Sequence, residues 1–357
     1  MENKQQRNSS IELLRIIAML FIITSHLRGH SGLNPSELPL TANKIFLQWG
    51  DLGQLGVVIF VIITGYFLST KTFSVKRLSS LFSQVWFYSL IIGAISIFVL
   101  NVNAGIMDII KVIFPTVLAE YWFFTAYTIL MLLSPFINIL ITNLDRSKFF
   151  NLIICMIILW VIIPTFTLQE MYGSRIIQFT LFYLIGAYFQ KYPDNCFSKK
   201  KIRLLCALVC LILLLLSNVC IEIVAQNLFS EIGKYRGHFY ERYSLLIVGL
   251  AVGLFTTAIY SKPFTNKFVN QLSACTFGVY LIHDNFLFRQ ILWTRIFNIS
   301  EIYQSPFFVI QAIAIVLTVF SACAIIEFVR LKTIATPLSN IVERFLQAIK
   351  QRFFTKT

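Results

Sequence analysis

The chain has 357 residues, of which 57% are hydrophobic and 13% are charged, and its mean hydropathy is +0.76. A soluble domain carries about 25% charged residues, so the composition excludes a soluble enzyme and predicts a polytopic membrane protein. The net charge of +14 comes from basic residues that lie between apolar spans. Because the positive-inside rule explains that pattern, no nucleic-acid partner is expected.

The first apolar segment, 11–28, contains two ionisable side chains, Arg15 and His26. A basic residue near mid-bilayer costs about 2.5–3.5 kcal/mol, and such residues usually face the protein interior and have a function. A spacing of eleven residues puts both on one helix face, roughly 16 Å apart along the axis. Glu12 precedes Arg15 by three residues on nearly the same face and can neutralise it.

Apolar runs of about 17–25 residues predict transmembrane helices along the chain. Ten such runs occur, at approximately 11–28, 52–69, 79–100, 121–141, 149–166, 176–190, 202–224, 244–261, 268–289 and 306–329. The segment 106–119 is apolar but short, so it either lies along the interface or re-enters the membrane. The predicted fold class is therefore an all-α polytopic membrane protein with about ten spans.

The distribution of basic residues predicts how the spans are oriented in the membrane. With the N-terminus inside, 20 of the 30 Lys and Arg residues are cytoplasmic, nine lie outside, and Arg15 lies within the first span. This bias predicts that both termini are cytoplasmic. The segment 331–357 alternates apolar and basic residues with a helical period, which predicts an amphipathic helix on the inner leaflet. We therefore divide the chain into a membrane domain, 1–330, and a basic tail, 331–357.

A second histidine is expected near His26. His283 falls late in the span 268–289, which also runs outward, so the two imidazoles should have similar depth, with Asp284 beside them. Imidazole can accept a proton from an attacking hydroxyl near neutral pH. No serine-centred nucleophile motif, metal-ligand pair or paired carboxylates accompany it. This pattern favours group transfer from an activated donor, without a metal and without a permanently bound cofactor.

Several motifs follow one another in a recognisable order. They are Glu12-Leu13-Leu14-Arg15 followed by His26, Phe60-Val61-Ile62-Ile63-Thr64-Gly65-Tyr66, Tyr121-Trp122-Phe123 with Ser134-Pro135-Phe136, and Thr276-Phe277-Gly278-Val279-Tyr280-Leu281-Ile282-His283. Together they resemble the motifs of membrane-bound acyltransferase family 3, and the resemblance covers essentially the whole chain. Two departures are Thr64, where serine is common, and Glu120, in a region where histidine often stands.

The resemblance implies an O-acyltransferase of a bacterial-type plasma membrane. It would move an acetyl group from cytoplasmic acetyl-CoA, its donor substrate, to a hydroxyl of a cell-envelope glycan. His26 would be the general base, with an acetyl-histidine relay as the less favoured version. Arg15, supported by Glu12, would act with Lys76 and Arg77 to hold the anionic head of the donor.

The resemblance also implies an acceptor site. His283 or Asp284 would orient His26 or the acceptor. The external loop 225–243 contains a dense aromatic and basic set, and the aromatic span at 121–141 adds further candidates for sugar contact. The predicted substrate-binding residues are Trp122, Tyr127, Tyr235, Arg236 and His238, together with Asp284. Interfacial anchoring of the loop and core packing of the first two aromatics are the simpler alternatives.

A transporter or flippase of a surface-polysaccharide precursor is the main alternative function, because its spans also carry isolated ionisable groups at mid-depth. Against it, the sequence shows no internal repeat and no pair of Gly/Pro-broken half-helices. A sensory or anchoring protein without turnover offers no reason for Arg15 and His26 to share a helix face. The sequence leaves the acceptor, the acyl group and the oligomeric state open.

Overall fold

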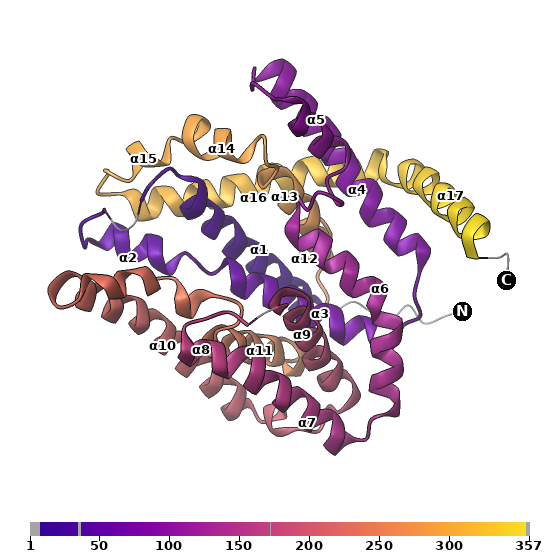
Figure 1. Cartoon of the computed structure of the whole chain (residues 1–357), viewed down its shortest axis with the longest axis horizontal. Coiled ribbons are helices and arrows are strands. Elements are labelled where there is room, and N and C mark those ends of the chain that lie inside the picture. The colour runs from indigo at the N-terminus through magenta and orange to yellow at the C-terminus, as the bar shows by residue number, and fades with distance from the viewer. Residues whose placement is uncertain (1–7, 35–36, 172, 355–357) are drawn as a thin grey trace.

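The computed structural model describes residues 8–34, 37–171 and 173–354, and within these ranges every regular element is a helix (Figure 1). The α-helices are α1 (Ser9–His30), α2 (Ala42–Trp49), α3 (Gly53–Leu68), α4 (Val75–Ala94), α5 (Ile106–Ile113), α6 (Trp122–Asn143), α7 (Arg146–Ile157), α8 (Ile163–Thr167), α9 (Ser174–Lys191), α10 (Lys200–Asn227), α11 (Leu245–Tyr260), α12 (Lys267–Ala274), α13 (Thr276–His283), α14 (Arg289–Ile291), α15 (Ile299–Ile302), α16 (Phe308–Thr333) and α17 (Ala335–Phe354). Short π- or 3₁₀-helical segments are η1 (Ile95–Val99), η2 (Ile158–Ile162), η3 (Cys196–Ser198), η4 (Ser230–Tyr235), η5 (His238–Tyr240) and η6 (Leu292–Ile296).

Eight helical segments of the described chain are long and apolar enough to cross a membrane. They coincide with eight of the predicted spans, and the protein is therefore an all-α, multi-pass membrane protein. The other two predicted spans correspond to α9, which is almost wholly buried among other helices, and to the pair α12 and α13. The count of ten and the cytoplasmic position of both termini stay predictions.

The predicted continuous helix at 268–289 is wrong in two respects. It breaks at Cys275, where Thr276 Oγ1 donates a hydrogen bond to the Ser273 carbonyl, and it ends at His283. Side chains that bond to nearby backbone groups compete with helical hydrogen bonds. After His283 the Asn285 side chain accepts from the Leu287 amide and donates to the Tyr121 hydroxyl, which fixes a turn in place of the last predicted helical residues.

Helix α1 lies between the two hydrophobic cores of the protein. Ile11, Leu14 and Ala18 pack in one core with α3, α9 and α11, whereas Ile23 and Leu27 pack in the other with α4, α13 and α16. Figure 1 shows α1 accordingly in the middle of the molecule, with α16 on one side and α10 and α11 on the other. Every polar residue on α1 is accordingly buried or half-buried.

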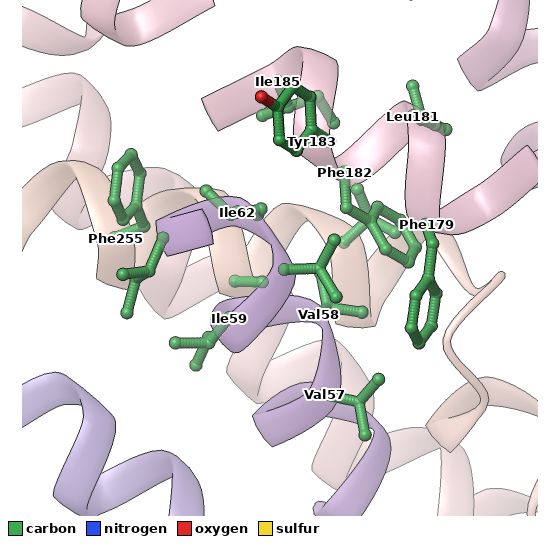
Figure 2. Packing of buried hydrophobic residues seen from close by; sticks show 14 of the residues in the cluster. Val57, Val58, Ile59, Ile62, Phe179, Leu181, Phe182, Tyr183, Ile185 and Phe255 are labelled. Atoms are coloured by element: carbon green, nitrogen blue, oxygen red, sulfur yellow. The ribbon is translucent and has the colours of Figure 1, made fainter. Parts of the chain in front are cut away.

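The tightest helix crossing in the first core joins α3 and α9. A β-carbon added to Gly186 would lie 2.0 Å from the Ile62 carbonyl oxygen, and one added to Gly65 would lie 2.0 Å from that of Tyr183. Small residues permit this approach in membrane helices. Figure 2 shows the surrounding contact, in which Val58 and Ile62 of α3 face the aromatic side chains of α9. Gly249 and Gly253 likewise let α11 approach Cys210 and Ala207 of α10, as their four-residue spacing predicts.

Replacing Gly186 with alanine is expected to destabilise the fold by about 1–3 kcal/mol, because the new methyl group must push two backbones apart. The thermal melting temperature of the purified protein should fall accordingly. Gly237→Ala is the matched control, since its new β-carbon meets nothing within 4 Å and its φ of −93° suits alanine. Equal melting temperatures for the two variants would show that α3 and α9 can accommodate the added methyl group without loss of stability.

Two segments predicted outside the spans are helical. α5 occupies part of the segment 106–119 and projects beside the end of α4, where Ser89 Oγ donates to the Val112 carbonyl (Figure 1). α17 forms in the predicted amphipathic tail and packs along α4 through Ser339 and Val342. The side chains of its predicted apolar positions Phe345, Ile349 and Phe353 lie outside the described part of the structure.

Candidate active site

Helices α1 and α13 bring two imidazoles together. His26 Nδ1 lies 2.9 Å from His283 Nε2, and His283 Nδ1 lies 2.6 Å from the Val279 carbonyl oxygen. A carbonyl only accepts, so His283 Nδ1 carries the proton and its Nε2, in the neutral ring, accepts from His26 Nδ1. This assignment from the hydrogen-bond network leaves His26 Nε2 unprotonated and free to act as a base.

Charged groups lie close to this pair. Asp284 Oδ1 lies 3.7 Å from His26 Nδ1 and 3.4 Å from Arg289 Nη1, and the Asp284 side chain is buried. A carboxylate at this distance stabilises the positive charge that His26 gains when Nε2 takes a proton. His30 Nε2 lies 3.8 Å from the same oxygen. No group of three His, Cys, Asp or Glu side chains in the described ranges is placed to hold a metal ion.

Arg15 is held in position from one side. Its Nη1 donates to Glu12 Oε2 over 3.2 Å, and Ser273 Oγ donates to the same oxygen over 2.5 Å. Glu12 is buried, whereas 30% of the Arg15 side chain is exposed, and its guanidinium lies 5.7 Å from the centre of the Phe67 ring. Glu12 and Ser273 therefore fix the arginine while leaving part of its guanidinium free for a ligand.

Two adjoining cavities meet at this arginine. We name them by the predicted orientation of the chain. The outer cavity, of about 450 Å³, lies toward the C-terminal end of α1 and is lined by Arg15 and His26. The inner cavity, of about 720 Å³, lies toward the N-terminal end of α1 and is lined by Arg15, Lys71 and Arg77. Both include Thr64 and Tyr127 in their walls. Arg15 and His26 thus line one cavity, and a second cavity with two further cations begins where the first ends.

One of three comparisons with known proteins gives a match. A family model described as an acyltransferase domain, that of acyltransferase family 3, matches residues 8–327. The chain belongs to acyltransferase family 3. It is an acyltransferase, and the match includes every residue that lines the two cavities. Comparisons with curated proteins and with solved structures give no significant match.

Of the predicted donor-binding residues of this acyltransferase, some line a cavity and one does not. Arg77 lines the inner cavity together with Arg15, whereas Lys76 is exposed and lines neither cavity. Lys71, from the same basic loop, takes part in the inner wall instead. The periodicity of a helix explains the difference, because neighbouring residues at the start of α4 point about 100° apart.

The predicted acceptor-side residues are likewise divided. Trp122 and Tyr127 of α6 both line the outer cavity of the acyltransferase. His283 and Asp284 lie behind His26 and are fully buried, so they are placed to act on the imidazole of His26. The predicted orienting partners therefore lie next to His26, in direct contact with it or within 4 Å of it.

The loop residues Tyr235, Arg236 and His238 line neither cavity. Arg236 Nε donates to Glu222 Oε2 over 2.6 Å, and His238 Nε2 donates to the Thr165 carbonyl over 3.0 Å, so their polar atoms hold the loop itself in place. The Tyr235 ring packs at an edge-on angle against His238. Their predicted role in substrate binding has no support from this placement.

Sequence reasoning missed a polar group at the outer end of the outer cavity. Ser25 and Arg28 of α1, Asp51 from the turn between α2 and α3, and Gln54 of α3 all line it. The signal available was the position of two opposite charges, Arg28 and Asp51, at the outer ends of consecutive spans. Such ends lie close together because antiparallel neighbours share one loop.

Proposed function

We propose that this acyltransferase moves an acetyl group from cytoplasmic acetyl-CoA to a hydroxyl of a cell-envelope glycan, in a bacterial-type plasma membrane, with His26 as the general base. The observation that carries the proposal is the position of His26. Its unprotonated Nε2 belongs to a ring that lines the same cavity as Arg15, and that cavity adjoins a cationic one.

The inner cavity suits the anionic head of the donor. Lys71, Arg77 and the partly exposed Arg15 supply positive charge there, and guanidinium groups bind phosphate oxygens through two parallel N–H donors. Lys76, exposed in the first turn of α4, adds long-range attraction at the entrance. The arm of the donor would then pass Thr64 and Tyr127 and bring its thioester along α1 toward His26.

The proposed chemistry is a direct transfer. The acceptor hydroxyl gives its proton to His26 Nε2 while its oxygen bonds to the thioester carbonyl carbon. The carbon–sulfur bond then breaks, and the imidazolium returns the proton to the leaving thiolate. His283 keeps His26 in the required tautomer, and Asp284 stabilises the intervening positive charge. Trp122 and Tyr127 form aromatic walls for the reacting groups.

The test is product formation by the purified full-length protein in lipid discs. Labelled acetyl-CoA and a deacetylated envelope glycan fraction are supplied, and acetyl ester on the glycan is the expected product. Envelope glycan from a strain that lacks the protein should correspondingly lose O-acetylation. Movement of glycan precursor across the membrane without any acyl product would contradict the proposal and favour transport.

Replacing Arg15 with lysine is expected to raise the Michaelis constant for acetyl-CoA about tenfold, because the charge is kept while the paired N–H donors are lost. Steady-state kinetics with varied acetyl-CoA measures this. Arg146→Lys is the matched control, since Arg146 is exposed at the start of α7, donates to the Asp194 carbonyl, lies over the Tyr192 ring and lines neither cavity. A normal constant in Arg15→Lys would make Arg15 a structural residue.

A further inference from the structure

The outer end of the outer cavity carries a cluster of polar groups that the transfer mechanism does not use. Asp51 accepts hydrogen bonds from Arg28 Nη1 and, over 2.7 Å, from Ser25 Oγ. All three residues line the cavity, and 23% of each charged side chain is exposed. Ser25 directly precedes His26, so this cluster lies within one helical turn of the proposed base.

Two polar atoms of this wall have no hydrogen-bond partner in the described protein. Arg28 Nε is a donor without an acceptor, and Gln54 Oε1 is an acceptor without a donor, although both atoms are shielded from water. Such atoms are rare in folded proteins and are costly unless something pairs with them. Both residues line the cavity, so a ligand whose entry turns these two side chains toward it can supply the missing partners.

A hydroxyl group matches these two atoms. A hydroxyl both donates and accepts, so the hydroxyls of one ligand can donate to Gln54 Oε1 and accept from Arg28 Nε–H. Asp51 keeps spare lone pairs for a neighbouring hydroxyl. Trp122, the first residue of α6, lies in the same cavity wall and offers an apolar ring surface. The combination is suited to a ligand with several adjacent hydroxyls.

We propose that Arg28, Asp51 and Gln54 form a hydroxyl-binding subsite that holds the polyhydroxylated acceptor while another of its hydroxyls faces His26. This inference rests on the proposed function and assigns the positioning of the acceptor to these three residues. None of them touches the reacting atoms, so they are positioning residues. Their loss weakens acceptor binding and leaves donor binding and the base intact.

The test uses the full-length protein in lipid discs, with labelled acetyl-CoA and deacetylated envelope glycan as the acceptor probe. Gln54→Leu removes the free acceptor, and Arg28→Lys keeps the charge opposite Asp51 while removing the Nε–H donor. Each variant should raise the acceptor Michaelis constant about 3- to 10-fold, the range expected for one lost hydrogen bond. The acetyl-CoA Michaelis constant and the slow hydrolysis of acetyl-CoA without acceptor should stay within twofold of wild type.

Gln271→Leu is the matched control, because Gln271 is exposed on α12 and lines neither cavity. An unchanged acceptor constant in both test variants overturns the subsite while leaving the proposed function intact. The subsite is also overturned if the variants lower the turnover number and the melting temperature but leave the acceptor Michaelis constant unchanged. The cluster would then have a structural role. Absence of acetylated glycan with the wild-type protein overturns the proposed function, and the subsite with it.

Discussion

Replacing His26 with alanine is expected to lower the turnover number for acyl transfer about 10²–10⁴-fold, the usual contribution of a positioned general base. The only proton acceptor that the His26–His283 hydrogen bond leaves free is His26 Nε2, and that ring lines the cavity shared with Arg15. The Michaelis constant for acetyl-CoA should stay close to wild type, because the cations of the inner cavity are untouched. Single-turnover transfer of labelled acetyl measures the chemical step directly.

His30→Ala provides the matched control for this experiment. His30 lies one helical turn further along α1 and is 25% exposed at the side chain, against 20% for His26, but it does not line the outer cavity. It should retain more than a tenth of the wild-type turnover number. If His26→Ala retains as much of the wild-type turnover number as His30→Ala does, with melting temperatures unchanged, His26 is not the base.

The position of α1 explains why these residues can work together. One face of α1 packs in the core with α3 and α9, the other packs with α13 and α16, and the polar face opens into the cavities between them. A guanidinium and an imidazole on that face are therefore shielded from lipid without being sealed off. α1 also packs tightly on α3, since a β-carbon added to Gly56 would lie 2.4 Å from the Ala18 carbonyl oxygen.

Sequence reasoning was most successful where the information is local. An apolar run long enough to span a bilayer requires a helix, since no other backbone arrangement satisfies its polar groups in lipid. The bounds of α1, α3 and α6 accordingly differ from the prediction by only a few residues. The common face of Arg15 and His26 follows from helical spacing alone, and both indeed line the outer cavity.

What the sequence did not reveal depends on pairings between distant residues. The break at Cys275 accompanies a hydrogen bond from Ser273 to Glu12, which is 261 positions earlier in the chain. Arg236 resembled a sugar-binding residue because its aromatic neighbours are local, whereas its partner, Glu222, lies on another element. Helical periodicity carries no information about which loop charge meets which helix, so such pairs require the folded structure.

Replacing Glu222 with glutamine is expected to destabilise the protein by about 3–5 kcal/mol, the cost of breaking a buried ion pair by removing one partner. Glu222 is fully buried and accepts from Lys44 Nζ over 2.5 Å, from Gln48 Nε2 over 3.0 Å and from Arg236 Nε over 2.6 Å. Lys44 is also fully buried, so its ammonium would remain without a counter-charge. The melting temperature and the denaturant midpoint of the purified protein measure the loss.

The double variant Lys44→Met with Glu222→Gln separates charge burial from packing. If the uncompensated ammonium causes the loss, removing it should restore at least half of the stability, because Arg236 keeps 19% of its side chain exposed and can remain hydrated. Glu301→Gln, on the exposed side of α15, is the matched control and should leave the melting temperature unchanged. A double variant as unstable as Glu222→Gln alone would assign the loss to hydrogen bonding around α2.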